Sequence, residues 1–174
     1  MSAPARLAIH GASGRMGQGL VRALETRPDL RLVGALAAPG TPGLGEDVGK
    51  VVGLDRRFDV RVTADRTAAL AGAQVAVDFT QVSARVGNVE ACAAHGCALL
   101  IGTTGLDAAA HAAIDAAARR IPVIQAANTS LGVNLLAELV QQAAAALPLA
   151  YDIEIVEAHH RHKVDAPSGT ALRL

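Results

Sequence analysis

Short apolar runs and longer alanine-rich stretches follow one another along most of the chain. The apolar runs have the length and β-branched content of buried strands, and the stretches between them have helical spacing. This alternation is typical of a parallel sheet joined by crossover helices, an α/β architecture. The expected strands are 6–10, 30–36, 60–63, 75–80, 98–101 and 121–126, and the expected helices are 18–26, 66–71, 83–95, 107–119 and 132–147.

The last part of the chain predicts two further features. Apolar and acidic residues alternate over 151–156, which predicts a strand that would carry the histidines after it at its carboxyl end. The Pro-Ser-Gly-Thr sequence at 167–170 predicts a helix start, with Ser168 or Thr170 as the cap. Free N–H groups at such a start would hold a carboxylate or a phosphate.

A glycine-rich loop follows the first expected strand. Its glycines have the spacing G-x-x-G-x-x-G: Gly11 is expected to make the tight turn, Gly14 to let a pyrophosphate approach, and Gly17 to let helix pack on strand. The strand–loop–helix–strand context favours dinucleotide binding over a structural turn. The expected cofactor-binding residues of the loop are Gly11, Ala12, Ser13, Gly14, Arg15, Met16 and Gly17.

The choice between NADH and NADPH is left open by the end of the second expected strand. Dinucleotide-binding domains often carry an acid there, which bonds the ribose hydroxyls. This chain has Ala37 at that position, and its nearest acids, Glu46 and Asp47, lie beyond a stretch rich in Gly and Pro. Without the acid, no carboxylate repels the 2′-phosphate of NADPH at this position. Arg56 and Arg57 are too far along the chain to be assigned to that phosphate.

Three other loops end expected strands: 78–80, 102–105 and 126–130. In an open parallel sheet, ligands lie outside the carboxyl ends of the strands, so these loops are candidates for cofactor contact. The 102–105 loop, Gly-Thr-Thr-Gly, is equally compatible with an ordinary turn that has a threonine cap.

The run 157–171 gathers acid/base groups beside the expected anion site. A histidine titrates near neutral pH, so His159 or His160 can give or take a proton while Lys163 and the helix start hold an anionic substrate. A zinc site is an alternative, but adjacent histidines of a strand point to opposite faces and no further ligand pair completes a set, so we expect no metal. A solvated charged loop is the other alternative.

Composition limits the classes of partner. The 174 residues are 51% hydrophobic and 18% charged, with zero formal net charge, one Tyr, two Phe and no Trp. Neither a basic surface nor stacking platforms for nucleic acid are evident. There is no signal peptide and no apolar run of membrane-spanning length, so we expect a cytoplasmic protein. Cys92 and Cys97 are expected to be reduced, partly buried thiols.

These motifs together resemble one family closely, the 4-hydroxy-tetrahydrodipicolinate reductases of the diaminopimelate route to lysine, also called dihydrodipicolinate reductases. The resemblance covers essentially the whole chain, and the most specific motif is the run from Glu157 to Leu172. The other matching segments are 11–17, 78–80, 102–105, 126–128 and 132–134.

The resemblance implies a Rossmann-like nucleotide-binding domain with an inserted α+β substrate domain of mixed sheet, in a cytoplasmic homotetramer. Residues 1–130 would form the first domain and 131–174 the start of the second, which is expected to be incomplete in this chain. The implied reaction is NADH- or NADPH-dependent reduction of 4-hydroxy-tetrahydrodipicolinate, a small dicarboxylate, to tetrahydrodipicolinate.

The resemblance also implies residue roles. His159 resembles the proton donor and Lys163 the second catalytic cation. The implied substrate contacts are His160, Ser168, Gly169, Thr170 and Thr104. The implied cofactor contacts beyond the glycine loop are Gly102, Thr103, Thr104, Ala126, Ala127, Asn128 and Thr129.

Two positions depart from the family's pattern: Ala37 replaces the acidic ribose ligand of many relatives, and Thr129 replaces an aromatic found in some. Two other functions stay open: another NAD(P)-dependent dehydrogenase of amino or keto acids, and a dinucleotide-binding regulator without turnover.

Overall fold

A computed structural model describes residues 3–126, 128–148, 150–161, 163 and 166–174. The chain forms two compact units, 1–125 and 126–174. Among the described residues, no helix is long and apolar enough to cross a membrane.

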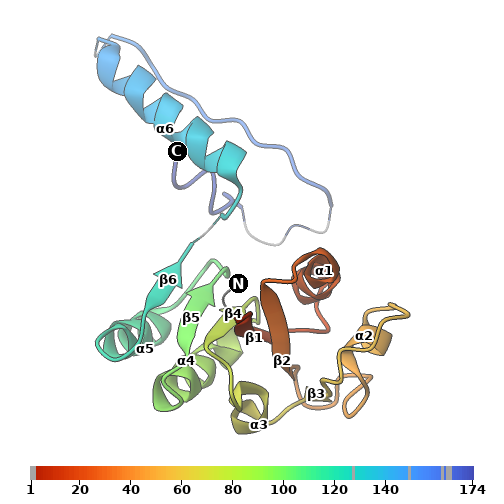
Figure 1. Ribbon diagram of the computed structural model, residues 1–174. Coiled ribbons are helices and arrows are strands. Elements are labelled where there is room, and N and C mark those ends of the chain that lie inside the picture. The colour runs from red at the N-terminus through yellow and green to blue at the C-terminus, as the bar shows by residue number, and fades with distance from the viewer. Residues whose placement is uncertain (1–2, 127, 149, 162, 164–165) are drawn as a thin grey trace. The chain divides into compact units, whose positions relative to one another are not determined.

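The first unit is built on a six-stranded sheet in the order β3-β2-β1-β4-β5-β6, in which all paired strands are parallel (Figure 1). This order places β1 and β4 side by side at the centre, so the carboxyl ends of both strands meet at the same edge. The sheet confirms the parallel α/β prediction. Its strands are β1 (Ala5–His10), β2 (Leu30–Leu36), β3 (Val62–Thr63), β4 (Val75–Asp78), β5 (Ala98–Ile101) and β6 (Val123–Gln125).

Helices cover both faces of the sheet and enclose two apolar cores. One core joins strand residues such as Ala8 and Leu99 to Val89 and Ile114 of two helices. The other contains Ile9, the next residue of β1, because successive side chains of a strand point to opposite faces. The helices of this unit are α1 (Arg15–Ala23), η1 (Leu24–Thr26), α2 (Val48–Val51), α3 (Arg66–Leu70), η2 (Val82–Ala84), α4 (Arg85–Ala94) and α5 (Ala108–Ala118).

The elements of the first unit follow the sequence predictions, and several ends shift by one or two residues, as in β3 and β6. Three differences have an identifiable local cause. Helix α1 begins at Arg15 and not at residue 18, because Gly14 already serves as its N-cap. Strand β4 ends at Asp78 and not at residue 80, because the Asp78 carboxylate accepts the Thr80 N–H at 2.7 Å and turns the chain. The irregular stretch after Pro39 contains the short helix α2, which is capped by Asp47.

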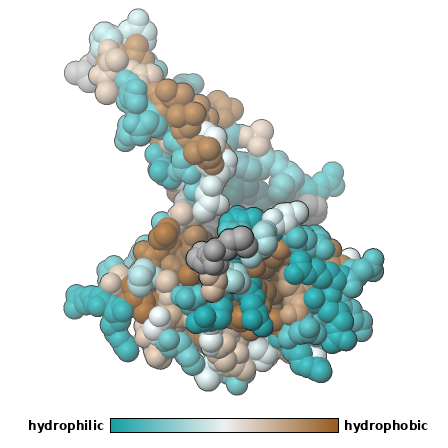
Figure 2. Space-filling view, in the orientation of Figure 1, coloured by the Kyte–Doolittle hydropathy of each residue, from teal (hydrophilic) through white to brown (hydrophobic). Residues whose placement is uncertain are grey.

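The second unit contains α6 (Leu131–Ala146), whose N-cap Ser130 accepts the Val133 N–H. The strand predicted over 151–156 is wrong: this segment has no strand structure, and Val156 is 92% exposed. No described residue of 126–174 forms a strand that could pair with it. The predicted helix start is instead one capped helical turn at 169–173. Apolar side chains lie exposed along α6 (Figure 2).

Candidate functional site

The glycine loop presents free backbone donors at the start of α1. Gly14 caps the helix without a side chain, and the N–H groups of Ser13, Arg15 and Met16 donate to no acceptor among the described residues. A Cβ on Gly17 would lie 2.1 Å from the Gly11 carbonyl oxygen, so only glycine lets the helix approach the loop this closely. Free N–H groups and the positive end of a helix dipole favour an anion such as a pyrophosphate.

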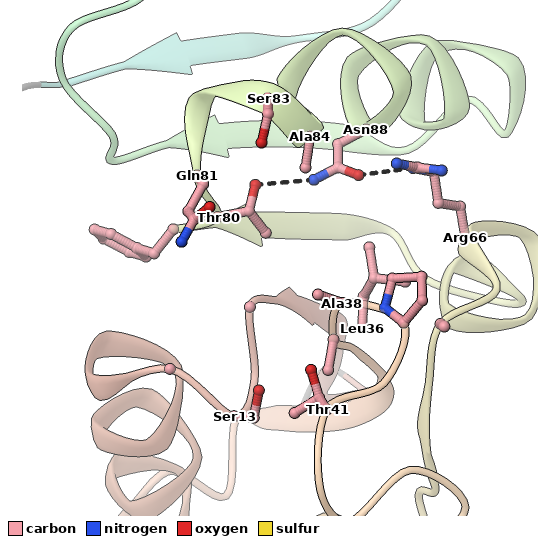
Figure 3. A pocket seen from close by; sticks show the side chains of 16 residues that line it. Ser13, Leu36, Ala38, Thr41, Arg66, Thr80, Gln81, Ser83, Ala84 and Asn88 are labelled. Atoms are coloured by element: carbon pink, nitrogen blue, oxygen red, sulfur yellow. Dashed lines mark hydrogen bonds between the residues drawn. The ribbon is translucent and has the colours of Figure 1, made fainter.

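A pocket of about 330 Å³ opens beside this loop (Figure 3). Ala37, 4% exposed, lies in its wall, and the acids that follow are engaged elsewhere: Glu46 pairs with Lys50 at 2.6 Å, and Asp47 caps α2. The pocket therefore offers no carboxylate to a ribose. It is lined by Gly11, Ser13, Gly14, Leu36, Ala37, Ala38, Pro39, Thr41, Ala64, Arg66, Phe79, Thr80, Gln81, Ser83, Ala84 and Asn88.

The loops after β1, β4 and β5 meet at the carboxyl edge of the sheet. A Cβ on Gly11 would lie 3.3 Å from the Phe79 carbonyl oxygen, and one on Gly102 only 2.1 Å from the Phe79 ring. Thr103 donates its hydroxyl to the Thr80 carbonyl oxygen at 2.9 Å. The glycine loop and the 102–105 loop, predicted separately from sequence, are therefore both packed against the Phe79–Thr80 turn. Thr104 is half-buried in the same loop.

A buried charge network lies beneath this edge of the sheet. Of its members, only Asp78 and Thr80 lie in a loop that the sequence predicts to be part of the site. Arg85 and Asp78, both fully buried, form an ion pair with Nη1 and Oδ2 2.6 Å apart, and His10 Nδ1 lies 3.7 Å from the same carboxylate. Burial alone would raise the pKa of Asp78, but His10, the Arg85 charge and Thr80 outweigh it and hold that pKa well below its ordinary value. The carboxylate is therefore ionised in the folded protein.

The network fixes the turn that carries Thr80. Asp78 Oδ1 accepts both the N–H and the hydroxyl of Thr80 at 2.7 Å, and Arg85 Nη2 donates to the Thr80 carbonyl oxygen at 3.1 Å. Asn88 donates to Asp78 Oδ2 and to Thr80 Oγ1. Every polar backbone and side-chain group of Thr80 is thus held, which makes this part of the pocket wall rigid.

The 126–130 segment belongs to the second unit. Asn128 accepts the Ser130 N–H at 2.8 Å and donates to Thr170 Oγ1 at 3.2 Å. This bond brings together two segments that are 42 residues apart and were both predicted as site residues. Ala126 is half-buried and Thr129 is exposed. Ala127, also a predicted cofactor contact, lies outside the described residues.

The histidine segment is organised by Glu157, which begins the predicted run 157–171 but received no role of its own from the sequence. Glu157 Oε1 accepts the Ser168 N–H at 2.9 Å, and its Oε2 lies 3.7 Å from His159 Nδ1. Hydrogen bonds from Ser168 lower the pKa of Glu157. His160 is exposed and its carbonyl oxygen accepts the Lys163 N–H at 3.1 Å, so one turn, which directly follows His159, joins His160 to Lys163.

Of the three residues predicted to hold an anion, Ser168 caps the turn at 169–173, whereas Gly169 and Thr170 belong to the turn itself. Ser168 is buried: its Oγ accepts the Ala171 N–H at 3.1 Å, and its own N–H is taken by Glu157. The N–H groups of Gly169 and Thr170 donate to no acceptor among the described residues. They remain available for a carboxylate, while Ser168 caps the turn. Within the described part of the chain, no three His, Cys, Asp or Glu side chains are grouped to hold a metal ion.

Comparison with known proteins agrees with both halves of this description. Residues 5–129 match the family model for the N-terminus of dihydrodipicolinate reductase, and 132–174 match that for its C-terminus. The chain is 53% identical over 169 residues to the 4-hydroxy-tetrahydrodipicolinate reductase of Thiobacillus denitrificans, and 48% identical to that of Anaeromyxobacter dehalogenans. In each case the match covers 97% of this chain and 62% of the relative, so the chain spans less than two thirds of their length.

A solved structure gives the same result. The dipicolinate-bound dihydrodipicolinate reductase from Paenisporosarcina sp. TG-14 superposes with a TM-score of 0.75 at 27% identity, over 98% of this chain and 63% of that one. Family models that together span nearly all residues, relatives with about half their residues identical, and this structural match lead to one conclusion. The chain belongs to the dihydrodipicolinate reductase family.

Proposed function

We propose that the protein containing this chain reduces 4-hydroxy-tetrahydrodipicolinate to tetrahydrodipicolinate with NADH or NADPH. The observation that carries the proposal is the turn at 169–173, where the free N–H groups of Gly169 and Thr170 follow directly on the segment that bears His159 and Lys163. An anion site joined to a proton donor and a cation suits a cyclic dicarboxylate. The dipicolinate bound to the Paenisporosarcina reductase is a ligand of that chemistry.

In this proposal the substrate-binding domain, which starts near residue 131 within the second unit, supplies the substrate groups. Gly169 and Thr170 bind one carboxylate through their N–H groups, and Lys163 neutralises the other or withdraws charge from the ring. Glu157 faces His159 Nδ1, which leaves Nε2 to carry the proton toward the substrate nitrogen. His160, on the same turn, contacts the substrate. Ser168 acts through its cap and not through direct contact.

The first unit fits a dinucleotide. Ser13, Arg15 and Met16 offer N–H groups to the pyrophosphate, Gly17 keeps the loop close to α1, and the pocket of about 330 Å³ beside them suits the adenosine half. Thr103 and Asn128 have fixed side chains among the proposed contacts of the other half. When bound, a reduced nicotinamide supplies the hydride, and the 4-hydroxyl of the substrate leaves as water, so that one reduced cofactor and one proton are consumed for each product.

The reaction is tested by the loss of NAD(P)H absorbance when the condensation product of pyruvate and aspartate semialdehyde is added to the purified protein. We expect His159→Ala and Lys163→Ala each to lower turnover by more than about a hundredfold, the contribution of a general acid or a desolvated charge, with cofactor affinity unchanged.

Two exposed residues of the first unit give matched controls: His111→Ala on α5, and Lys50→Ala, whose ammonium pairs with Glu46. Both controls should keep full turnover. Absence of turnover in the unmodified protein contradicts the proposed reaction, and normal turnover in both site variants contradicts the assignment of His159 and Lys163.

The assembly and location implied by the family resemblance complete the proposal: a homotetramer acting in the cytoplasm. Light scattering on the purified protein measures the mass of the assembly, and a monomer at micromolar concentration would contradict the tetramer.

A further inference from the structure

Arg66 is the one charged residue among those that line the pocket of the first unit. It is the first residue of α3, directly after the loop that follows β3, and its guanidinium lies over the pocket wall in Figure 3. The other lining residues are apolar or neutral. A ligand in this pocket therefore meets a single positive charge, and no motif of the sequence predicts one there.

The guanidinium is oriented by neutral groups. Arg66 Nε donates to Asn88 Oδ1 at 2.8 Å, and Asn88 is itself held by Asp78 and Thr80 of the buried network. A Cβ on Gly87 would lie 3.2 Å from Arg66 Cζ, so the guanidinium packs flat against α4 at a position without a side chain. The side chain is thus aimed by two independent contacts.

Both terminal nitrogens of Arg66 remain unused within the described part of the chain: they make no hydrogen bond there, and no acid forms an ion pair with them. The adjacent Asp65 is engaged in capping α3 through the N–H groups of Thr67 and Ala68. An oriented guanidinium whose two terminal nitrogens are unused can bind a phosphate in a bidentate manner.

The position of Arg66 relates it to the ribose. In a dinucleotide-binding sheet the ribose hydroxyls lie at the end of the second strand, here at Ala37. The Ala37 N–H donates to the Thr63 carbonyl oxygen at 2.9 Å, so Ala64, and with it the start of α3, lies alongside that strand end. Ala37 offers no carboxylate that would repel a phosphate at this place.

We propose that Arg66 binds the 2′-phosphate of NADPH and makes the protein prefer NADPH over NADH. The inference rests on the proposed nucleotide site and assigns its specificity to a residue after the third strand and not to one after the second. Asn88 is the positioning residue, because it holds Nε and leaves the terminal nitrogens to face the ribose.

Two probes that differ only in the 2′-phosphate test this: adenosine 2′,5′-bisphosphate and adenosine 5′-monophosphate, titrated calorimetrically on the purified protein. We expect the bisphosphate to bind at least about tenfold more tightly, as one charge-assisted bidentate contact supplies. Arg66→Ala should remove this difference by weakening the bisphosphate alone, and Arg66→Lys should keep part of it. Arg57→Ala, an exposed arginine outside the pocket, is the control and should change neither.

The possible outcomes separate the two proposals. If neither probe binds the unmodified protein, the nucleotide site itself is refuted. If both bind equally and Arg66→Ala changes nothing, the site stands and the role of Arg66 is refuted. An equal loss of both probes in Arg66→Ala also refutes it, because that pattern assigns the arginine to the adenine or to the pocket wall. NADPH and NADH titrations should follow the bisphosphate and the monophosphate in every variant.

Discussion

The buried ion pair between Arg85 and Asp78 makes a quantitative prediction, because the same unit contains an exposed pair of the same length. Both the Arg85–Asp78 and the Arg27–Asp29 pairs have a nitrogen–oxygen distance of 2.6 Å. The first pair is fully buried, whereas the side chains of the second are 54% and 59% exposed. Replacing each arginine by methionine therefore compares one contact in two surroundings.

The Arg85→Met variant should lose about 3–5 kcal/mol of unfolding free energy, because it leaves the Asp78 carboxylate buried without its counter-charge. Methionine fills much of the apolar volume of the arginine, so the loss reports mainly the charge and the bond to the Thr80 carbonyl oxygen. The three remaining bonds to Asp78, from Thr80 and Asn88, keep the loss from being larger. This is a large share of the roughly 5–15 kcal/mol that stabilises a typical domain.

Urea unfolding followed by circular dichroism measures the effect. With a slope of about 1–3 kcal/mol per molar urea, the Arg85→Met midpoint should fall by more than about 1 M. The Arg27→Met midpoint should stay close to that of the unmodified protein, since solvent screens an exposed pair. The double variant Arg85→Met/Asp78→Asn should recover part of the loss, because no charge is then left buried. Equal midpoints for the two single arginine variants would refute the reasoning.

Two further predictions concern the same network and the anion turn. The pKa of Asp78 in the folded protein lies below its ordinary value of 3.8, so the Asp78 carboxylate contributes fully to stability above pH 3.8, and this contribution is lost as the pH falls below that value. Urea titrations at stepped pH should therefore show a weaker loss of stability in acid for Asp78→Asn than for the unmodified protein. An unchanged dependence of stability on pH would contradict the role of the buried carboxylate. Gly169→Val should weaken binding of pyridine-2,6-dicarboxylate sharply and leave nucleotide binding unchanged, whereas the control Gly132→Val on α6 should leave the binding of both ligands unchanged. Calorimetric titration with each ligand measures this. If Gly169→Val weakens the binding of both ligands in parallel, the anion site is misplaced.

Local signals in the sequence were sufficient for the sheet and the glycine loop. Apolar runs between helical stretches determine strand positions, and the bounds of β2 and β5 were predicted to the residue. The spacing of Gly11, Gly14 and Gly17 has a direct steric meaning, since a side chain on Gly17 would collide with the loop. Such features depend on neighbours within a few residues, which is why periodicity and spacing reveal them.

Arg66 of the pocket and Arg85 of the buried charge network depend on distant neighbours, and sequence reasoning missed both. Arg85 precedes Val89 and Cys92 of α4 by four and seven residues, which puts the three on the same face of the helix. Helical spacing alone therefore predicts that this arginine lies on the buried face. That conflict is a signal that a buried partner exists. Asp78 could be identified as the partner only once β4 and α4 were packed together. Arg66 carried no such signal, because its use follows from the register of β3 beside β2.

The segment 151–156 shows most clearly what alternation can and cannot predict. When apolar and polar side chains alternate, a segment would have one apolar face if it formed a strand. A strand forms only when its N–H and C=O groups find those of a neighbour, and no strand lies among the described residues of 126–174. The segment therefore remains extended, with Ile153 60% exposed, while the turn that follows keeps its local bonds through Glu157 and Ser168. Local hydrogen bonds thus organise the proposed anion site without the sheet that the alternation predicts.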